Sequence, residues 1–155
     1  MKRLLVTCAL SLMGCQSMPS SEVADEVATP DVFAAIESWA TAFNNCDLDK
    51  ASALYDRDAV FWGTLSPKII TTPNGIRQYF QRICSAKMPS KVALGEQNVR
   101  LYGHIAINSG TYTFTSFADG KPRTNPARYS FTYRKKDGEW LIVDHHSSVI
   151  PSTPR

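Results

Sequence analysis

The sequence places its helix signals first and its strand signals last, and this order limits the fold more than any other feature. Thr29-Pro30-Asp31 and Thr72-Pro73 each have the pattern of a helix start, with a hydroxyl cap followed by proline. Beyond about residue 90 the pattern is of the β type, with strands expected at about 91–102, 105–117, 127–134 and 140–148. Helices followed by antiparallel strands indicate an α+β fold.

Three helices are expected before the long strands. Val32, Ile36, Trp39 and Phe43 follow helical spacing after the first start signal, and a short helix is expected at about 48–55. The third helix carries an apolar stripe of Ile76, Tyr79, Phe80 and Ile83. A curved sheet with helices on one face forms a cone whose open end is a pocket. Residues 118–126, between two of the expected strands, are expected to be a polar loop.

The first 15 residues have the order of a secretory signal, with Lys2 and Arg3 before a short apolar run. They end in LMGC, which resembles a bacterial lipobox, and the resemblance implies cleavage before Cys15 and lipidation of its thiol. An ordinary signal with a chance cysteine is the alternative. In Gram-negative relatives of the lipobox family the absence of Asp after the cysteine, where this sequence has Gln16, points to the outer membrane, so an outer-membrane lipoprotein facing the periplasm is expected. Residues 16–29 are interpreted as a flexible tether, and residues 30–151 as the domain.

Charge and hydropathy exclude two classes of partner. The formal net charge is +3 and no run of Lys and Arg exceeds two residues, so nucleic-acid binding is not expected. No apolar stretch approaches 18 residues, so the only predicted membrane contact is the lipid anchor.

Two cysteines remain in the predicted domain, Cys46 and Cys84, each near the end of a predicted helix. In an oxidising compartment they either form a disulfide or stay as two separate buried thiols. Their spacing is not that of a redox-active CxxC pair.

Two stretches, AVFWGTLSPKIITTPNGIRQYF and ARYSFTYRKKDGEWLIVDHHSS, resemble the nuclear-transport-factor-2-like (SnoaL-like) superfamily. The nearest resemblance is to the association (hub) domain of calcium/calmodulin-dependent protein kinase II and its bacterial relatives. It implies a cone-shaped fold and a homodimer that forms through the outer face of the sheet, but no particular reaction. The glycine loop and catalytic motifs of a kinase are absent, so a kinase is not predicted.

The paired histidines of DHH lie on the last predicted strand. A three-residue loop at Lys136-Asp137-Gly138 would place Lys135 opposite Glu139. Alternation then assigns one face to the cone interior: Tyr129, Phe131, Tyr133, Leu141, Val143 and His145. The other face would carry Trp140, Ile142 and His146. The two imidazoles therefore point in opposite directions, and no metal site is predicted.

The leading hypothesis is a protein that binds a small apolar or aromatic molecule in the cone without a cofactor. The residues expected to line its pocket are Trp62, Tyr79, Tyr112, Tyr129, Phe131 and His145. The hub domain lines its pocket with arginines, whereas the matching positions here are Tyr112, Phe131 and Ser147. One alternative is an isomerase or hydro-lyase with His145 as general base and tyrosines as proton donors. A second is an oligomeric assembly module, with Trp140 in the interface.

Overall fold

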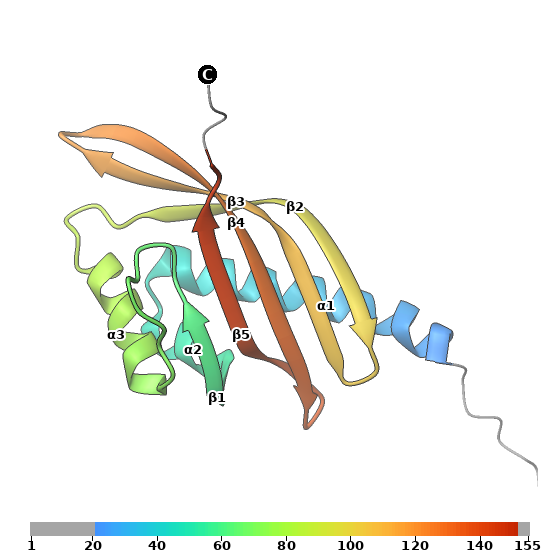
Figure 1. Cartoon of the computed structure of the whole chain (residues 1–155). Helices are drawn as coiled ribbons and strands as arrows, with labels where there is room; N and C mark the ends of the chain where they lie inside the picture. The colour runs from blue at the N-terminus through green and yellow to red at the C-terminus, as the bar shows by residue number, and fades with distance from the viewer. Residues whose placement is uncertain (1–20, 152–155) are drawn as a thin grey trace, which may run out of the picture.

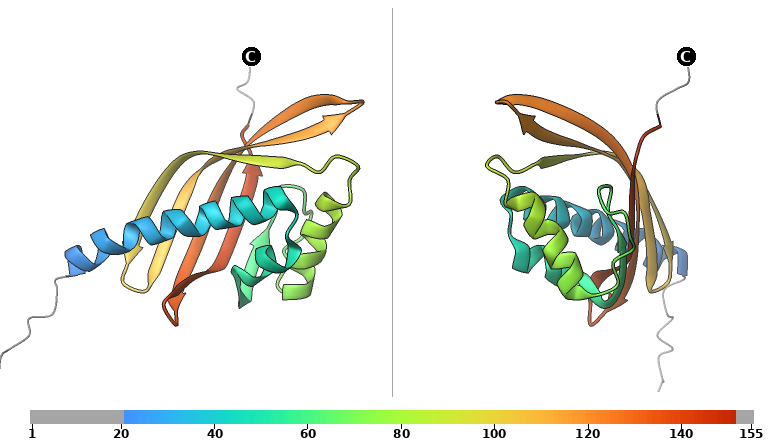
Figure 2. Two further views of the ribbon diagram at one scale, coloured as in Figure 1. Left: turned by 180° about the vertical axis from the view of Figure 1, so that it is seen from behind. Right: turned by 60° about the vertical axis from the view of Figure 1, so that its left-hand side comes forward.

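The computed structural model describes residues 21–151, with side chains from residue 29 onward. It contains α1 (Ser21–Asn45), α2 (Leu48–Ala53), β1 (Tyr55–Trp62), α3 (Pro73–Cys84), β2 (Lys91–Tyr102), β3 (Ile105–Ala118), β4 (Lys121–Lys136) and β5 (Glu139–Val149). The strands form one sheet in the order β1-β5-β4-β3-β2, in which only the β1–β5 pair is parallel. The sheet curves around the helices, which lie on its concave face (Figures 1 and 2). The predicted α+β cone is confirmed.

The first helix starts earlier than its capping signal indicates. It begins at Ser21 and continues through Pro30, whereas a start at Thr29-Pro30 is expected from the sequence. A proline removes only one backbone donor from a helix, so a helix can continue through it. The Thr29-Pro30 signal therefore marks a position where a helix can start but need not. Part of the expected tether, residues 21–29, is thus helical. The predicted lipobox and Cys15 lie outside the described residues.

The helices pack on the sheet through the predicted apolar positions. On α1, Val32, Ile36 and Trp39 are almost completely buried. On α3, Ile76 and Phe80 are equally buried. The cap of α3 is also as predicted, since the Thr72 hydroxyl accepts a hydrogen bond from the backbone N–H of Gly75. Tertiary burial thus agrees with local helix signals for both long helices.

The β4–β5 hairpin has a different register from the predicted one. Its turn contains two residues, Asp137 and Gly138, both with positive φ, so that Lys136 pairs with Glu139. Asp tolerates the left-handed conformation, which makes the tighter turn available. A bulge then places Val143 as an extra residue in β5 between the paired positions Ile142 and Asp144.

The bulge changes the faces of half of β5. Trp140 and Ile142 are buried in the core, whereas Leu141 and Val143 are only partly buried. The predicted faces of these four residues are wrong, and Trp140, only 6% exposed, is not available as an interface residue. Beyond the bulge the alternation is restored, with His145 buried and His146 exposed as expected.

The expected loop at 118–126 is instead part of a long β-ribbon. Its turn is Asp119-Gly120, with both φ angles positive, and β4 starts directly afterwards (Figure 1, upper left). Pro122 and Pro126 are tolerated because β5 pairs with β4 only from Ala127 onward, which leaves this part of β4 with β3 alone.

A disulfide joins Cys46, just after α1, to Cys84, the last residue of α3. Their Cα atoms are 5.7 Å apart. Cys46 has a positive φ of 53° and occupies the sharp turn between α1 and α2. The bond therefore ties together the C-terminal ends of the two long helices, close to the open end of the cone.

Candidate functional site

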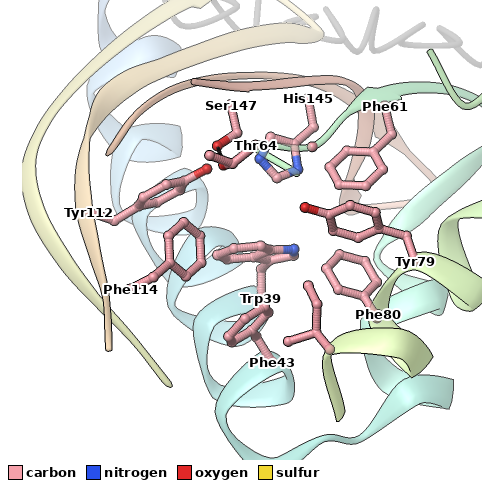
Figure 3. Close-up of a pocket in the computed structure, with 12 residues that line it drawn as sticks. Trp39, Phe43, Phe61, Thr64, Tyr79, Phe80, Tyr112, Phe114, His145 and Ser147 are labelled. Atoms are coloured by element: carbon pink, nitrogen blue, oxygen red, sulfur yellow. Dashed lines mark hydrogen bonds between the residues drawn. The ribbon is translucent and has the colours of Figure 1, made fainter. Parts of the chain in front are cut away.

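A small cavity lies inside the cone between the helices and the sheet (Figure 3). Its volume is about 20 Å³, which is room for about one water molecule. It is lined by Trp39, Phe43, Phe61, Gly63, Thr64, Tyr79, Phe80, Ile83, Tyr112, Phe114, His145 and Ser147. None of these residues is charged. We call this space the inner cavity.

A larger hollow adjoins the inner cavity at the open end of the cone. Its volume is about 270 Å³, and its exposed wall is mostly apolar. It is lined by Phe43, Thr64, Leu65, Tyr79, Ile83, Ser90, Phe114, Ser116, Asn125 and Val149. Five of these residues also line the inner cavity, so the two spaces share a wall. We call this hollow the vestibule; its size is close to the lower limit of typical small-molecule sites.

His145 is held at the base of the inner cavity by a buried chain of hydrogen bonds. Trp39 Nε1 donates to the Tyr55 hydroxyl over 3.1 Å, and that hydroxyl lies 2.8 Å from His145 Nδ1. An indole N–H can only donate, so the Tyr55 hydrogen remains free to donate to His145. We assign that hydrogen to His145 Nδ1 and the imidazole proton to Nε2, because the opposite tautomer would leave both the Tyr55 hydrogen and the Nε2 lone pair without a partner among the described residues.

Burial keeps this imidazole neutral. His145 is 2% exposed, and desolvation lowers its pKa well below the ordinary value, with a further lowering from the nearby His146. Its Nε2 has no hydrogen-bond partner among the described residues. The structure therefore presents an N–H donor, with no acceptor, beside the inner cavity.

Hydroxyl groups form the rest of the polar wall. Burial raises the pKa of Tyr112, and hydrogen bonding from the nearby Ser147 and Thr64 hydroxyls opposes that rise, although neither contact has the normal geometry of a hydrogen bond. The Tyr79 hydroxyl accepts from the Leu65 backbone N–H over 3.3 Å, and its own hydrogen is free to donate. Thr64 and Ser147 are hydrogen-bonded to each other. In Figure 3 these groups point inward from the rim of aromatic rings.

Three of the predicted pocket residues, Tyr79, Tyr112 and His145, do line the inner cavity. Tyr129 and Phe131 lie one layer further away. Tyr129 stacks on Tyr112 with ring centroids 4.8 Å apart, and Phe131 stacks on His145 at 3.7 Å. Both support the cavity wall without lining it.

Trp62 is not a pocket residue. It is 46% exposed and pairs with His146, on the face of the sheet opposite to the cavity. Alternation along β1 instead points Phe61 inward, opposite His145. The prediction that Trp62 lines the pocket is therefore wrong by one position. The alternation of the buried Ala59 and Phe61 along β1 is the signal that identifies the inner face.

Several lining residues were missed by the sequence analysis. The sequence pattern predicted Trp39 and Phe43 only as core residues, whereas Ser147 matches a pocket position of the hub domain and also follows from His145 by strand alternation. Tyr55 had no recognisable signal, because its contact with His145 joins β1 to β5 across 90 residues of sequence. Only the folded sheet brings these two side chains together.

The arrangement is suited to donating hydrogen bonds and not to removing protons. A general base must offer a free lone pair to the substrate. His145 Nδ1 is already engaged by Tyr55, and Nε2 carries the proton. This geometry argues against the general-base role for His145.

The buried imidazole gives stability a defined pH dependence. The unfolded chain binds a proton near the ordinary His pKa of about 6.5, whereas folded His145 does so only at lower pH. The stability that comes from a neutral His145 is fully present above about pH 6.5. Below that pH the free energy of unfolding falls by up to about 1.4 kcal/mol per pH unit. We expect urea unfolding at pH 7.5 and 5.5 to show this loss in the wild type but not in His145→Gln. Parallel pH curves for the two proteins would contradict the burial of a neutral His145.

Asp56 does not interfere with that measurement. Its carboxylate, on the outer face of β1, accepts a hydrogen bond from Arg134 over 2.8 Å, and this bond lowers its pKa. Stability from this pair is full above the ordinary Asp pKa of about 4 and is lost as pH falls below it. The two effects are thus separated by pH.

Neither a metal site nor a membrane-spanning helix is found in the part of the chain that the structure describes. No three His, Cys, Asp or Glu side chains come together there as metal ligands would. None of the helices between residues 21 and 151 is both long and apolar enough to cross a membrane.

The fold and the aromatic inner cavity define a nuclear-transport-factor-2-like cone. A protein of this class from Pseudomonas putida, of unknown function, shares the fold with a TM-score of 0.73 at 18% identity, covering 83% of this chain and 90% of its own. The chain matches the family model of the calcium/calmodulin dependent protein kinase II association domain over residues 28–151. It belongs to this family, as the sequence resemblance predicted.

Two solved association domains agree with the match. A Xanthomonas campestris structure, provisionally assigned as such a domain, is 34% identical, with a TM-score of 0.72 over 79% of this chain and 87% of its own. The association domain of the C. elegans kinase is 18% identical, with a TM-score of 0.68 over 81% of this chain and 98% of its own. The latter likeness concerns the fold alone.

Proposed function

We propose that this protein binds a small apolar or aromatic molecule in the vestibule and inner cavity, without chemical turnover. One observation carries the proposal: an uncharged, aromatic cavity adjoins an apolar hollow, and two of its buried donors have no partner of normal hydrogen-bond geometry among the described residues. Ligand sites typically combine apolar walls with a few convergent polar groups in this way. The absence of a free base at His145 favours binding over the isomerase or hydro-lyase alternative.

The neutral fluorescent dye N-phenyl-1-naphthylamine is a suitable probe for the vestibule. We expect its emission to rise on binding, and Leu65→Asp to weaken binding about tenfold, equivalent to about 1.4 kcal/mol. Leu65 is 77% exposed and lines the vestibule, so its replacement leaves the core intact. The matched control is Tyr102→Asp, on an exposed residue that does not line the vestibule. Equal dye binding by both variants, or none by the wild type, would refute this function.

We also propose that the protein is a lipid-anchored periplasmic protein of the outer membrane. The LMGC sequence ending at Cys15 supports the anchor. The disulfide between Cys46 and Cys84 supports an oxidising compartment, because such bonds are rare in the reducing cytosol. Labelled fatty acid incorporated by the wild type but not by Cys15→Ser is the test.

The outer face of the sheet is the proposed surface of a homodimer, and this proposal draws on the association-domain family. Ile107 on β3 pairs with Thr132 on β4, and both are partly exposed on this face. We expect light scattering to give a dimer mass for the wild type and a monomer mass for Ile107→Glu. Tyr102→Glu, at the end of β2, is the control and is expected to stay dimeric.

A larger assembly is the second candidate, favoured by the association-domain family match. In that case light scattering would give a mass of many subunits. A wild-type monomer at micromolar concentration would contradict both forms of the proposal.

A further inference from the structure

We infer that the inner cavity takes the carbonyl oxygen of an uncharged ligand, with His145 Nε2–H as the hydrogen-bond donor. This inference deepens the ligand-binding function proposed above and rests on it. It assigns opposite ends of the ligand to the two spaces: the carbonyl to the inner cavity and the apolar body to the vestibule.

The identity of the donor follows from the hydrogen-bond chain. Trp39 can only donate, so Tyr55 accepts from it, and the assignment that leaves the fewest groups unpaired has Tyr55 donating to His145 Nδ1. The proton on Nε2 then has no acceptor among the described residues. An unpartnered buried donor costs about 1–3 kcal/mol, so an incoming acceptor at this position is favoured.

Tyr112 supplies a second group of the same kind. Its hydroxyl is buried and lines the same cavity, and among the described residues no hydrogen bond of normal geometry reaches it, although the Ser147 and Thr64 hydroxyls lie nearby. It lies on β3, across the cavity from Phe61 and Tyr79 and close to Ser147 (Figure 3). A carbonyl oxygen has two lone pairs and therefore matches two donors that come from different strands.

Charge excludes a carboxylate as the preferred head group. Among the described residues, no Lys or Arg lines either the inner cavity or the vestibule. An anion placed in the inner cavity would lose its hydration without gaining a counter-ion, at a cost that neutral donors offset only in part. Ketones, esters and amides offer the same oxygen without that cost.

Size separates the two ends of the ligand. The inner cavity, at about 20 Å³, has room for about one water-sized group, such as a carbonyl oxygen. The vestibule, at about 270 Å³, has space for an aromatic ring system between Phe43, Ile83 and Phe114. The ligand class is therefore a flat apolar molecule with a carbonyl group at one end.

A matched set of three naphthalenes tests this class by calorimetry. The set contains 2-acetylnaphthalene, its hydrocarbon isostere 2-isopropenylnaphthalene, and 2-naphthoate. We expect the ketone to bind the full-length protein about tenfold more tightly than either of the others, which corresponds to one or two neutral hydrogen bonds. In Tyr112→Phe the ketone should bind about threefold to tenfold more weakly while the hydrocarbon is unaffected. Tyr129→Phe is the matched control, since its hydroxyl contacts Asn108 outside the cavity, and should keep the full preference.

The protonation site of His145 is measured separately, in ligand-free protein, by long-range ¹H–¹⁵N NMR. The expected result is a protonated Nε2 and an unprotonated Nδ1. A proton on Nδ1, or a ketone that binds no better than the hydrocarbon, overturns the inference while the binding function stands. If none of the three compounds binds, the proposed function fails and the inference fails with it.

Discussion

Replacement of both Cys46 and Cys84 by serine is expected to lower the free energy of unfolding by about 4 kcal/mol. The two cysteines are separated by 38 residues, and the chain-entropy relation for a closed loop of that length gives this magnitude at 25 °C. The loop contains α2, β1 and most of α3, so the bond restricts a large part of the unfolded chain. Urea unfolding of the oxidised wild type and the double variant measures the difference.

A thiol reductant provides the control for that result. Dithiothreitol should bring the wild type close to the stability of the double variant and leave the variant unchanged. A difference below about 1 kcal/mol between oxidised wild type and variant would mean that the bridge restrains little of the unfolded state. We also expect loss of the bridge to make the wall of the vestibule less rigid. Phe43 and Ile83 lie in that wall, next to the helix ends that the bridge joins.

Tyr55→Phe should be the other strongly destabilising change, with an expected cost of about 2–5 kcal/mol. A single buried hydroxyl serves both Trp39 Nε1 and His145 Nδ1, and removal of one partner leaves each group unsatisfied at about 1–3 kcal/mol. The ring itself is kept, so packing against Phe61 and Phe80 is retained. Urea unfolding at pH 7.5 is the measurement.

Tyr129→Phe is the matched comparison for Tyr55→Phe. Its hydroxyl makes one longer contact, 3.4 Å to Asn108 Oδ1, and its loss should cost about 1 kcal/mol or less. If Tyr55→Phe were as stable as Tyr129→Phe, the hydrogen-bond chain would not be what holds His145 in place. The tautomer proposed for His145 would then lose its physical cause.

Local patterns predicted most of the fold. The cap at Thr72, the stripes on α1 and α3, and the bounds of β2 could be read from the sequence because each depends on neighbouring residues. The resemblance to association domains supported the cone, whereas the strand order became visible only in the structure. The opposite orientation of His145 and His146 was predicted, because it requires only strand alternation.

The errors have two physical sources. The β3–β4 and β4–β5 hairpins use two-residue turns with an Asp in the left-handed conformation, where the sequence pattern predicted longer loops. The bulge at Val143 has no local signal, and it moved Trp140 into the core. At the site, the residue that determines the state of His145 is Tyr55, which only the folded sheet brings beside it.

A crystal structure of the protein with 2-acetylnaphthalene tests most directly whether the cone is a site for an uncharged carbonyl ligand. The predicted result is a naphthalene ring in the vestibule, with its ketone oxygen at about 3 Å from His145 Nε2. A ring bound only outside the cone, or a carbonyl that points out to solvent with His145 Nε2 still unpartnered, would contradict the proposed site.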